Sequence, residues 1–256
     1  MAAEVLVPTS ADEAASLYGD GEGITIFAGG TILLPDIAMG RLRLERALML
    51  HRSGLDDLRA DGDVVRIGAM VPVAKLVDFD EPMLARFAEH IADREVRRNA
   101  TVGGNLCAGP APASVRGDLG APLIALGARV RSTGRGGERK EAVEDFLAGD
   151  RTGRLVLEVE YHRANRRWGA SGMRRRHAHS YQIASVAVCE REGELRVGVA
   201  GIGPAAVRAR SVEQSRDPAD VLKDVQPIDD AVASAAYRRK ILPLLVRDAL
   251  DDLENA

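Results

Sequence analysis

The chain has 256 residues, which is enough for one large domain or two to three small ones with hydrophobic cores. Its 46% hydrophobic and 29% charged content is that of an ordinary globular protein, and its net charge of −3 gives no reason to expect nucleic acid as a partner. No apolar run approaches the roughly 18 to 20 residues that span a bilayer, and residues 1–9 lack the pattern of a signal peptide, so we expect a cytoplasmic protein.

The N-terminal residues predict a short strand, a capped helix and a second strand. Residues 5–7 form the first apolar run, and Thr9 or Ser10 can cap a helix in which Glu13 completes a capping box. Residues 24–27 are β-branched or aromatic and run directly into a glycine pair. A further strand at 48–50 and a helical turn at 53–58 follow.

The middle of the chain combines a hairpin, two helices and further strands. Asp61-Gly62 predicts the turn before a strand at 64–69, and Leu84, Phe87, Ala88 and Ile91 have the spacing of an amphipathic helix. A second helical face carries its apolar residues at Leu119, Leu123 and Leu126. Strands are expected at 128–131 and 155–161, with a glycine-rich turn at 132–140 between them.

A basic segment, residues 163–179, separates this region from a C-terminal module. Strands at 183–189 and 195–199 flank a turn at 191–194, and helices follow. The last helix is expected to carry four apolar residues on its packed side: Tyr237, Ile241, Leu244 and Leu245. Two antiparallel strands with helices on one face predict an α+β module.

Two glycine pairs suggest a site for a phosphate-rich ligand. Gly29-Gly30 follows a predicted strand, and Gly103-Gly104 follows a basic segment, each pair with a threonine beside or near it. Without Cβ atoms, a backbone turn can bring successive N–H groups close to an anion. Each pair alone is a weak signal, because glycine is common in turns. The two together suggest one ligand held from two sides.

The two stretches resemble motifs of a known flavoprotein family. Ala28-Gly29-Gly30-Thr31-Ile32-Leu33 is similar to A-G-G-T-[DN]-L, and Ala100-Thr101-Val102-Gly103-Gly104-Asn105 is similar to A-T-[IV]-G-G-N. These are patterns of the flavoprotein, or medium, subunit of molybdenum hydroxylases of the xanthine dehydrogenase and aerobic carbon monoxide dehydrogenase type. The resemblance extends to Asp118 with its following helix, to residues 144–149 (D-F-F-x-G) and to residues 236–240 (Y-R-R).

This resemblance implies an α+β fold with two domains. Residues 1–162 would form a two-part FAD-binding domain of the vanillyl-alcohol-oxidase/PCMH type, with subdomains at about 1–54 and 55–162. Residues 163–256 would form a small α+β C-terminal domain with an antiparallel sheet.

The resemblance also implies an oxidoreductase subunit with FAD as its cofactor. Substrate would be oxidised at a molybdenum cofactor in a large partner subunit, and electrons would cross [2Fe-2S] clusters in a small partner subunit to this flavin. NAD⁺ or a quinone would accept them, and the assembly would be a dimer of heterotrimers. No residue of this chain would act as acid or base on the organic substrate. Two other interpretations stay open: a standalone FAD-dependent oxidoreductase, and a scaffold subunit that has lost FAD.

By the same resemblance, thirteen positions are expected to bind the cofactor. Thr31 and Thr101 can add hydroxyl donors and Asn105 an amide, while Asp118 would bind a polar part of FAD such as a ribose hydroxyl or cap the next helix. Tyr181 would lie near the flavin ring or in the core. The full set is Ala28, Gly29, Gly30, Thr31, Ile32, Leu33, Thr101, Val102, Gly103, Gly104, Asn105, Asp118 and Tyr181.

The sequence departs from the family pattern at one of these positions and at two further positions around the flavin ring. Ile32 stands where the family has Asp or Asn, and Met173 and Ser180 stand where it has Lys and Asp around the ring. These departures motivate the scaffold interpretation.

The remaining candidates favour structural roles. The basic run 174–179 is typical of a solvated or subunit-facing loop, and His177 and His179 lack a third metal ligand. Cys107 and Cys189 are too few for a four-cysteine metal site, so any cluster belongs to a partner, and Cys107 is expected to be a small packing residue.

Overall fold

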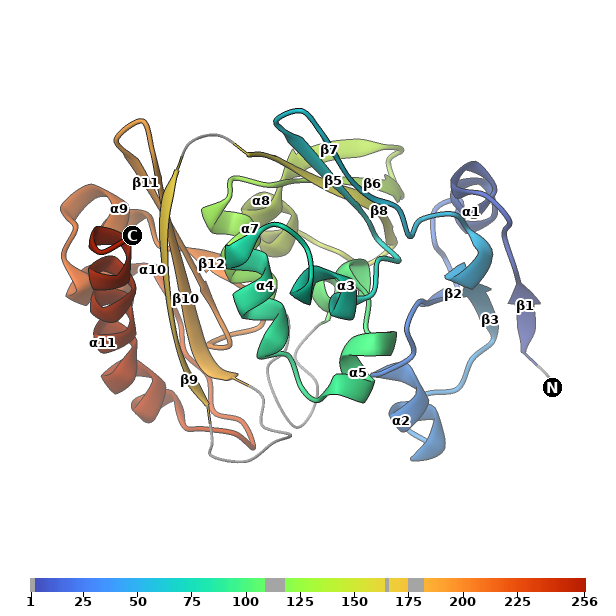
Figure 1. Cartoon of the computed structure of the whole chain (residues 1–256). Coiled ribbons are helices and arrows are strands. Elements are labelled where there is room, and N and C mark those ends of the chain that lie inside the picture. The colour runs from blue at the N-terminus through green and yellow to red at the C-terminus, as the bar shows by residue number, and fades with distance from the viewer. Residues whose placement is uncertain (1–2, 109–117, 164–165, 175–181) are drawn as a thin grey trace.

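The computed structural model describes residues 3–108, 118–163, 166–174 and 182–256. Three sheets follow one another along the chain and across the molecule (Figure 1). The first has three strands in the order β1-β3-β2, the second five in the order β4-β5-β8-β6-β7, and the third four in the order β12-β11-β10-β9. No helix among these described residues is long and apolar enough to cross a membrane.

The first sheet is parallel and packs on a small core that it shares with residues 155 and 157 of the second sheet. Its strands and helices are β1 (Glu4–Leu6), α1 (Ala11–Tyr18), β2 (Ile24–Phe27), α2 (Leu33–Ala38), β3 (Arg46–Met49) and the 3₁₀ turn η1 (Leu50–Arg52). The predicted capped helix is confirmed, since the Glu13 N–H donates to Ser10 Oγ at 3.1 Å. The helical turn expected at 53–58 lies instead at Leu50–Arg52, directly after β3.

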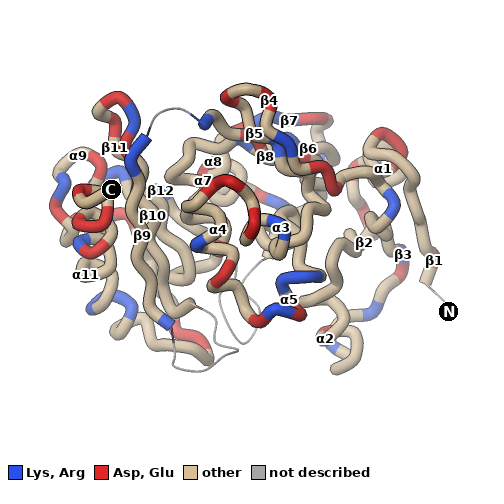
Figure 2. The backbone as a smooth tube through the Cα atoms, in the orientation of Figure 1, with Lys and Arg blue, Asp and Glu red and all other residues tan. Residues whose placement is uncertain are grey.

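The second sheet is antiparallel. Its strands are β4 (Leu58–Asp61), β5 (Val64–Gly68), β6 (Arg129–Gly134), β7 (Arg139–Ala142) and β8 (Arg154–His162). Asp61 pairs with Val64, which confirms the predicted hairpin. Charges of both signs lie along these strands (Figure 2), and Lys140 Nζ lies 2.6 Å from Glu160 Oε1. This charged surface is a solvated face.

Six short helices accompany the second sheet. They are α3 (Val73–Val77), α4 (Pro82–Glu89), α5 (Arg94–Asn99), α6 (Val102–Leu106), α7 (Gly120–Ala125) and α8 (Val143–Ala148). The predicted amphipathic helix is α4, and its four apolar positions are all buried, although Ile91 lies beyond the helix end. Every residue of α7 is buried, because α7 contacts the third sheet as well as α4 and α8.

The third sheet has four strands where two were predicted. Its elements are β9 (Arg167–Arg174), β10 (Gln182–Arg191), β11 (Glu194–Ala200), β12 (Val207–Arg208), α9 (Arg210–Ser215), η2 (Pro218–Asp220), α10 (Val221–Asp224) and α11 (Ala235–Glu254). Strand β9 comes from the segment that was interpreted as a basic separator. Its interior is built of small residues, because α11 packs so closely that a Cβ on Gly169 would lie 2.1 Å from the Ala249 carbonyl oxygen. Because small residues replace the usual alternation of apolar and polar side chains, the sequence pattern did not predict this strand.

The predicted packed face of α11 is wrong at two positions. Tyr237 and Leu244 are 41% and 46% exposed, whereas Ile241 and Leu245 are buried as expected. The face is rotated because Arg238, 1% exposed, points into the protein. Its guanidinium donates to backbone carbonyls such as that of Ile228, at 2.7 Å, and to Asp230 Oδ2 at 2.9 Å. Each nitrogen of the guanidinium has an acceptor, which makes this buried charge tolerable.

The main core joins the second and third sheets. Ala187 and Cys189 of β10 belong to the same buried cluster as Leu123 and Ile124 of α7. A second cluster lies between the third sheet and α11. Each sheet falls within one of the segments 1–54, 55–162 and 163–256, but the shared core does not test that domain division, which stays a prediction.

Candidate functional site

A cavity of about 670 Å³ lies where the first and second sheets meet. It brings together the two glycine pairs, which are 73 residues apart in the sequence (30 to 103). Twenty-eight residues line it: Tyr18, Ile24, Ile26, residues 28–33, Leu50, Ala69, Ile91, Val96, Ala100, Thr101, residues 103–105, Cys107, Ala108, Asp118, residues 149–152 and residues 154–156. This set contains eleven of the thirteen predicted cofactor positions.

The first glycine pair forms a tight turn between β2 and α2. A Cβ on Gly29 would lie 1.9 Å from the Asn99 carbonyl oxygen, so the turn packs directly on the end of α5. Gly30 has φ +70°, a conformation that favours glycine. Together these two constraints explain why both positions lack a side chain.

The turn leaves a run of free donors at the cavity wall. Among the described residues, no hydrogen bond uses the backbone N–H groups of residues 29–33. The next N–H along the chain, that of Leu34, is already bonded, because it donates to the Gly30 carbonyl at 2.9 Å. Residues 28–33 all line the cavity. Successive unpaired N–H groups at a concave wall are donors suited to an anion.

The second glycine pair is helical, which corrects the expectation of a loop with bare amides. Thr101 is the N-cap of α6, and its Oγ1 accepts from the Gly104 N–H at 3.1 Å. The Gly103 N–H donates to the Ala69 carbonyl at 2.9 Å, and the Val102 N–H to the Val71 carbonyl at 3.0 Å. These amides are therefore already satisfied and are not free for a ligand.

The two glycines of α6 serve different purposes. A Cβ on Gly103 would lie 2.8 Å from the Ala69 Cβ, so Gly103 allows α6 to pack against β5 and its following turn. A Cβ on Gly104 would meet only Thr101 Oγ1, at 3.0 Å. Gly104 thus presents bare backbone to the cavity.

Three other predicted residues of this region have distinct positions. Val102 does not line the cavity, because its side chain is fully buried in the main core. Asn105 lines it, and its Oδ1 accepts from the Leu119 N–H at 3.0 Å, which ties α6 to α7. Asp118 also lines it and is 4% exposed, while the N-cap position of α7 belongs to Leu119 and not to Asp118.

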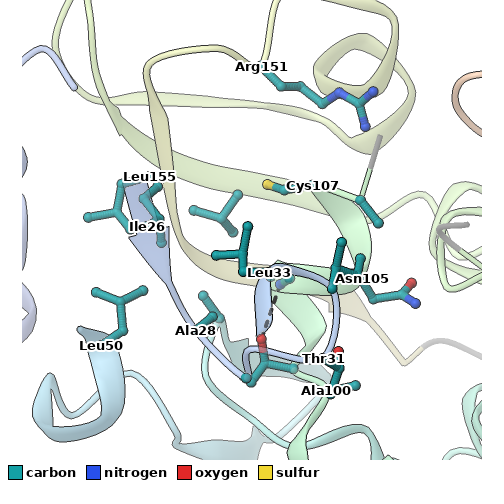
Figure 3. A pocket seen from close by; sticks show the side chains of 18 of the residues that line it. Ile26, Ala28, Thr31, Leu33, Leu50, Ala100, Asn105, Cys107, Arg151 and Leu155 are labelled. Atoms are coloured by element: carbon teal, nitrogen blue, oxygen red, sulfur yellow. Dashed lines mark hydrogen bonds between the residues drawn. The ribbon is translucent and has the colours of Figure 1, made fainter. Parts of the chain in front are cut away.

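An apolar wall forms one side of the cavity and was not predicted. Figure 3 shows Ile26, Leu50 and Leu155 gathered on that side. Ile24 and Ile26 point to the same face because side chains alternate along a strand. That alternation was the sequence signal from which this part of the wall could have been predicted. An apolar wall of this kind suits a flat ring system.

Two arginines reach the cavity, Arg151 from the segment between α8 and β8 and Arg154 from the first position of β8. Arg154 is 4% exposed and its guanidinium donates to Ser132 and to the Arg135 and Gly137 carbonyls. Burial lowers the pKa of Arg154 below its usual value. Arg151 lies closer to α6, and its Nη1 donates to the Leu106 carbonyl at 3.0 Å.

Cys107 lines the cavity and is not a packing residue. Its side chain is accessible from the cavity (Figure 3), although protein atoms surround the thiol closely. This burial raises the pKa of the Cys107 thiol to about 11. Cys107 is thus a neutral thiol near pH 7, and a neutral thiol is a poor nucleophile.

Several candidates lie elsewhere. Tyr181, Ser180, His177 and His179 are outside the described residues. Met173 packs against the C-terminal core between the third sheet and α11. Within the described ranges, no three His, Cys, Asp or Glu side chains form a group that could hold a metal ion.

Comparisons with known proteins point to one family. Residues 1–160 match the family model described as "FAD binding domain in molybdopterin dehydrogenase". The 6-hydroxypseudooxynicotine dehydrogenase complex subunit alpha of Paenarthrobacter nicotinovorans is 28% identical, over 96% of this chain and 93% of its own length. The carbon monoxide dehydrogenase medium chain of Hydrogenophaga pseudoflava is 24% identical, over 97% and 96%. A solved structure of carbon monoxide dehydrogenase from Hydrogenophaga pseudoflava shares the fold, with a TM-score of 0.86 at 24% identity over 100% of this chain and 98% of that one.

Proposed function

Since this chain belongs to the family of FAD-binding domains in molybdopterin dehydrogenases, we propose that it is the FAD-binding electron-transfer subunit of a molybdenum hydroxylase complex. The observation that carries the proposal is the run of free N–H groups in residues 29–33 at the wall of a 670 Å³ cavity.

The residues present fit FAD. The diphosphate of FAD needs several donors in a confined site, and the free amides of residues 29–33 supply them together with the Thr31 hydroxyl. Gly104 allows the cofactor to approach the α6 backbone. The apolar wall of Ile26, Leu50 and Leu155 accommodates a ring, for which we propose adenine.

The other polar residues of the cavity would orient the cofactor. We assign Asn105 and Asp118 to its hydroxyl groups, and Thr101 to holding the α6 backbone in place. Ile32 provides its backbone N–H, so the absence of an Asp or Asn side chain there does not remove the diphosphate donors. Tyr181 remains our candidate for the flavin ring. When bound, FAD supplies the exchange of electrons, one or two at a time.

The partners follow from the same proposal. Relatives that this chain matches over more than nine tenths of their length are named as the subunit alpha of a dehydrogenase complex and as a medium chain. We propose a large molybdenum-cofactor subunit and a small [2Fe-2S] subunit as partners, in a dimer of heterotrimers, and NAD⁺ or a quinone as the acceptor. The chain would fold as domains 1–162 and 163–256.

The first experiment measures cofactor binding. Purified protein reconstituted with FAD and desalted should show flavin absorbance close to one FAD per chain, and FAD should raise its melting temperature. Absence of both effects would overturn the proposal and favour a scaffold subunit.

The second experiment tests the complex. The protein, tagged and isolated from its native host, should carry two further subunits together with iron and molybdenum. A flavin-loaded chain that elutes alone and oxidises a substrate by itself would instead establish a standalone oxidoreductase.

A further inference from the structure

Arg151 is a cation of the cavity whose hydrogen-bonding capacity is mostly unused. A guanidinium has five N–H donors, and among the described residues Arg151 uses one of its groups, Nη1, in the bond to Leu106. Arg154 contrasts with it, because its Nε, Nη1 and Nη2 all donate to acceptors of the protein.

Arg151 also has no carboxylate partner among the described residues. Asp118 and Asp150 line the same cavity, yet no ion pair within the described part of the chain includes Arg151. Arg151 is half-buried, so part of its charge is removed from water, and an anion in the cavity would compensate it. The bond to Leu106 fixes the side chain against the end of α6, along the same wall as Cys107 (Figure 3).

The position of Arg151 in the chain indicates which half of a ligand it meets. Arg151 lies in the short segment before β8, and Leu155 at the start of β8 belongs to the apolar wall. The free amides of residues 29–33 are neutral donors, so they leave the charge of a diphosphate uncompensated. An arginine is suited to phosphate oxygens because its donors form a planar fork.

We propose that Arg151 binds the adenosine-diphosphate half of FAD and supplies the positive charge that the amide cradle lacks; this rests on the proposed function. Its hydrogen bond to Leu106 makes it a positioned donor. FAD affinity then depends on Arg151 through charge, and not only through the packing of α6.

The test compares Arg151→Gln and Arg151→Lys with the wild-type chain, using FAD and ADP as ligands in titration calorimetry at low and high salt. Arg239→Gln is the matched control, because Arg239 is an exposed α11 residue that does not line the cavity. We expect Arg151→Gln to weaken both ligands about 10- to 100-fold, the range for a lost charge-assisted hydrogen bond. Arg151→Lys should recover part of the affinity, and Arg239→Gln should bind like wild type.

Salt dependence separates a charge contact from a packing role. ADP affinity of the wild type should fall more steeply with salt than that of Arg151→Gln. Unchanged ADP affinity in Arg151→Gln overturns the proposal, and so does a loss that leaves the salt dependence unaltered and accompanies a lower melting temperature of the cofactor-free protein. If the wild type binds neither FAD nor ADP, the proposed function fails as well, which distinguishes the two.

Discussion

Gly103 and Gly104 are adjacent, but the structure predicts opposite consequences when each is changed to alanine. Gly103→Ala places a Cβ 2.8 Å from the Ala69 Cβ and 3.0 Å from its carbonyl oxygen, so α6 must move away from the turn after β5. In Gly104→Ala the new Cβ contacts only Thr101 Oγ1, at 3.0 Å, and the hydroxyl must shift by a few tenths of an ångström. Gly103→Ala therefore tests how tightly α6 packs in the folded protein, and Gly104→Ala tests whether FAD contacts the α6 backbone.

The magnitudes follow from the two environments. Overpacking of a tight core contact costs about 1–3 kcal/mol, so Gly103→Ala should lower the free energy of unfolding by that order. In Gly104→Ala the gain from helix propensity, up to about 1 kcal/mol, offsets the small strain and leaves stability nearly unchanged. If FAD packs on the backbone at Gly104, the methyl group should weaken FAD by about 1–3 kcal/mol, which is roughly 5- to 150-fold.

Urea unfolding of the cofactor-free proteins measures the first quantity, and flavin fluorescence titration with FAD measures the second. Gly104→Ala should fold like wild type and bind FAD poorly. Wild-type FAD affinity in Gly104→Ala would refute the assignment of this backbone as a cofactor contact. A large loss of stability in the same variant would refute the inference that the cavity leaves space for a Cβ at position 104.

Three further predictions concern single side chains. Because the pKa of the Cys107 thiol is about 11, its alkylation by iodoacetamide should be slow at neutral pH, accelerate with rising pH and be blocked by FAD, with Cys107→Ser as the unlabelled control in mass spectrometry. Arg238→Met should lower the free energy of unfolding by about 3–5 kcal/mol in urea, since it removes the guanidinium that neutralises the buried Asp230 carboxylate; a loss below about 1 kcal/mol would contradict this. Burial alone would raise the pKa of Glu144, but its backbone hydrogen bond and two neighbouring arginines hold the pKa below the usual 4.5, so its contribution to stability is present above that pH and lost as pH falls through the lowered pKa. The melting temperature of Glu144→Gln should accordingly fall less on acidification than that of the wild type. An equal fall in both proteins would contradict a stabilising role for the ion pairs of Glu144 with Arg196 and Arg208.

Local elements with strong chemical signals could be predicted from the sequence. The cap at Ser10, the hairpin at Asp61 and the buried run of β8 depend on neighbouring residues, and the structure confirms them. Elements shaped by distant contacts could not. Strand β9 has small residues because α11 lies against it, and α11 is rotated because Arg238 finds its acceptors in distant carbonyls such as those of Ile183 and Gly201.

The candidate site divides in the same way. The sequence by itself predicted that the two glycine pairs and their threonines form one site, because the absence of a side chain is a local property set by residue type, and the structure brings both pairs to one cavity. Only the tertiary structure decided how each pair acts. The turn at Gly29 and Gly30 keeps its amides free, whereas the carbonyls of Ala69 and Val71 and the Thr101 hydroxyl occupy those of α6. Which donors remain for a ligand depends on acceptors that come from elsewhere in the chain, and the same holds for the apolar wall and for Arg151.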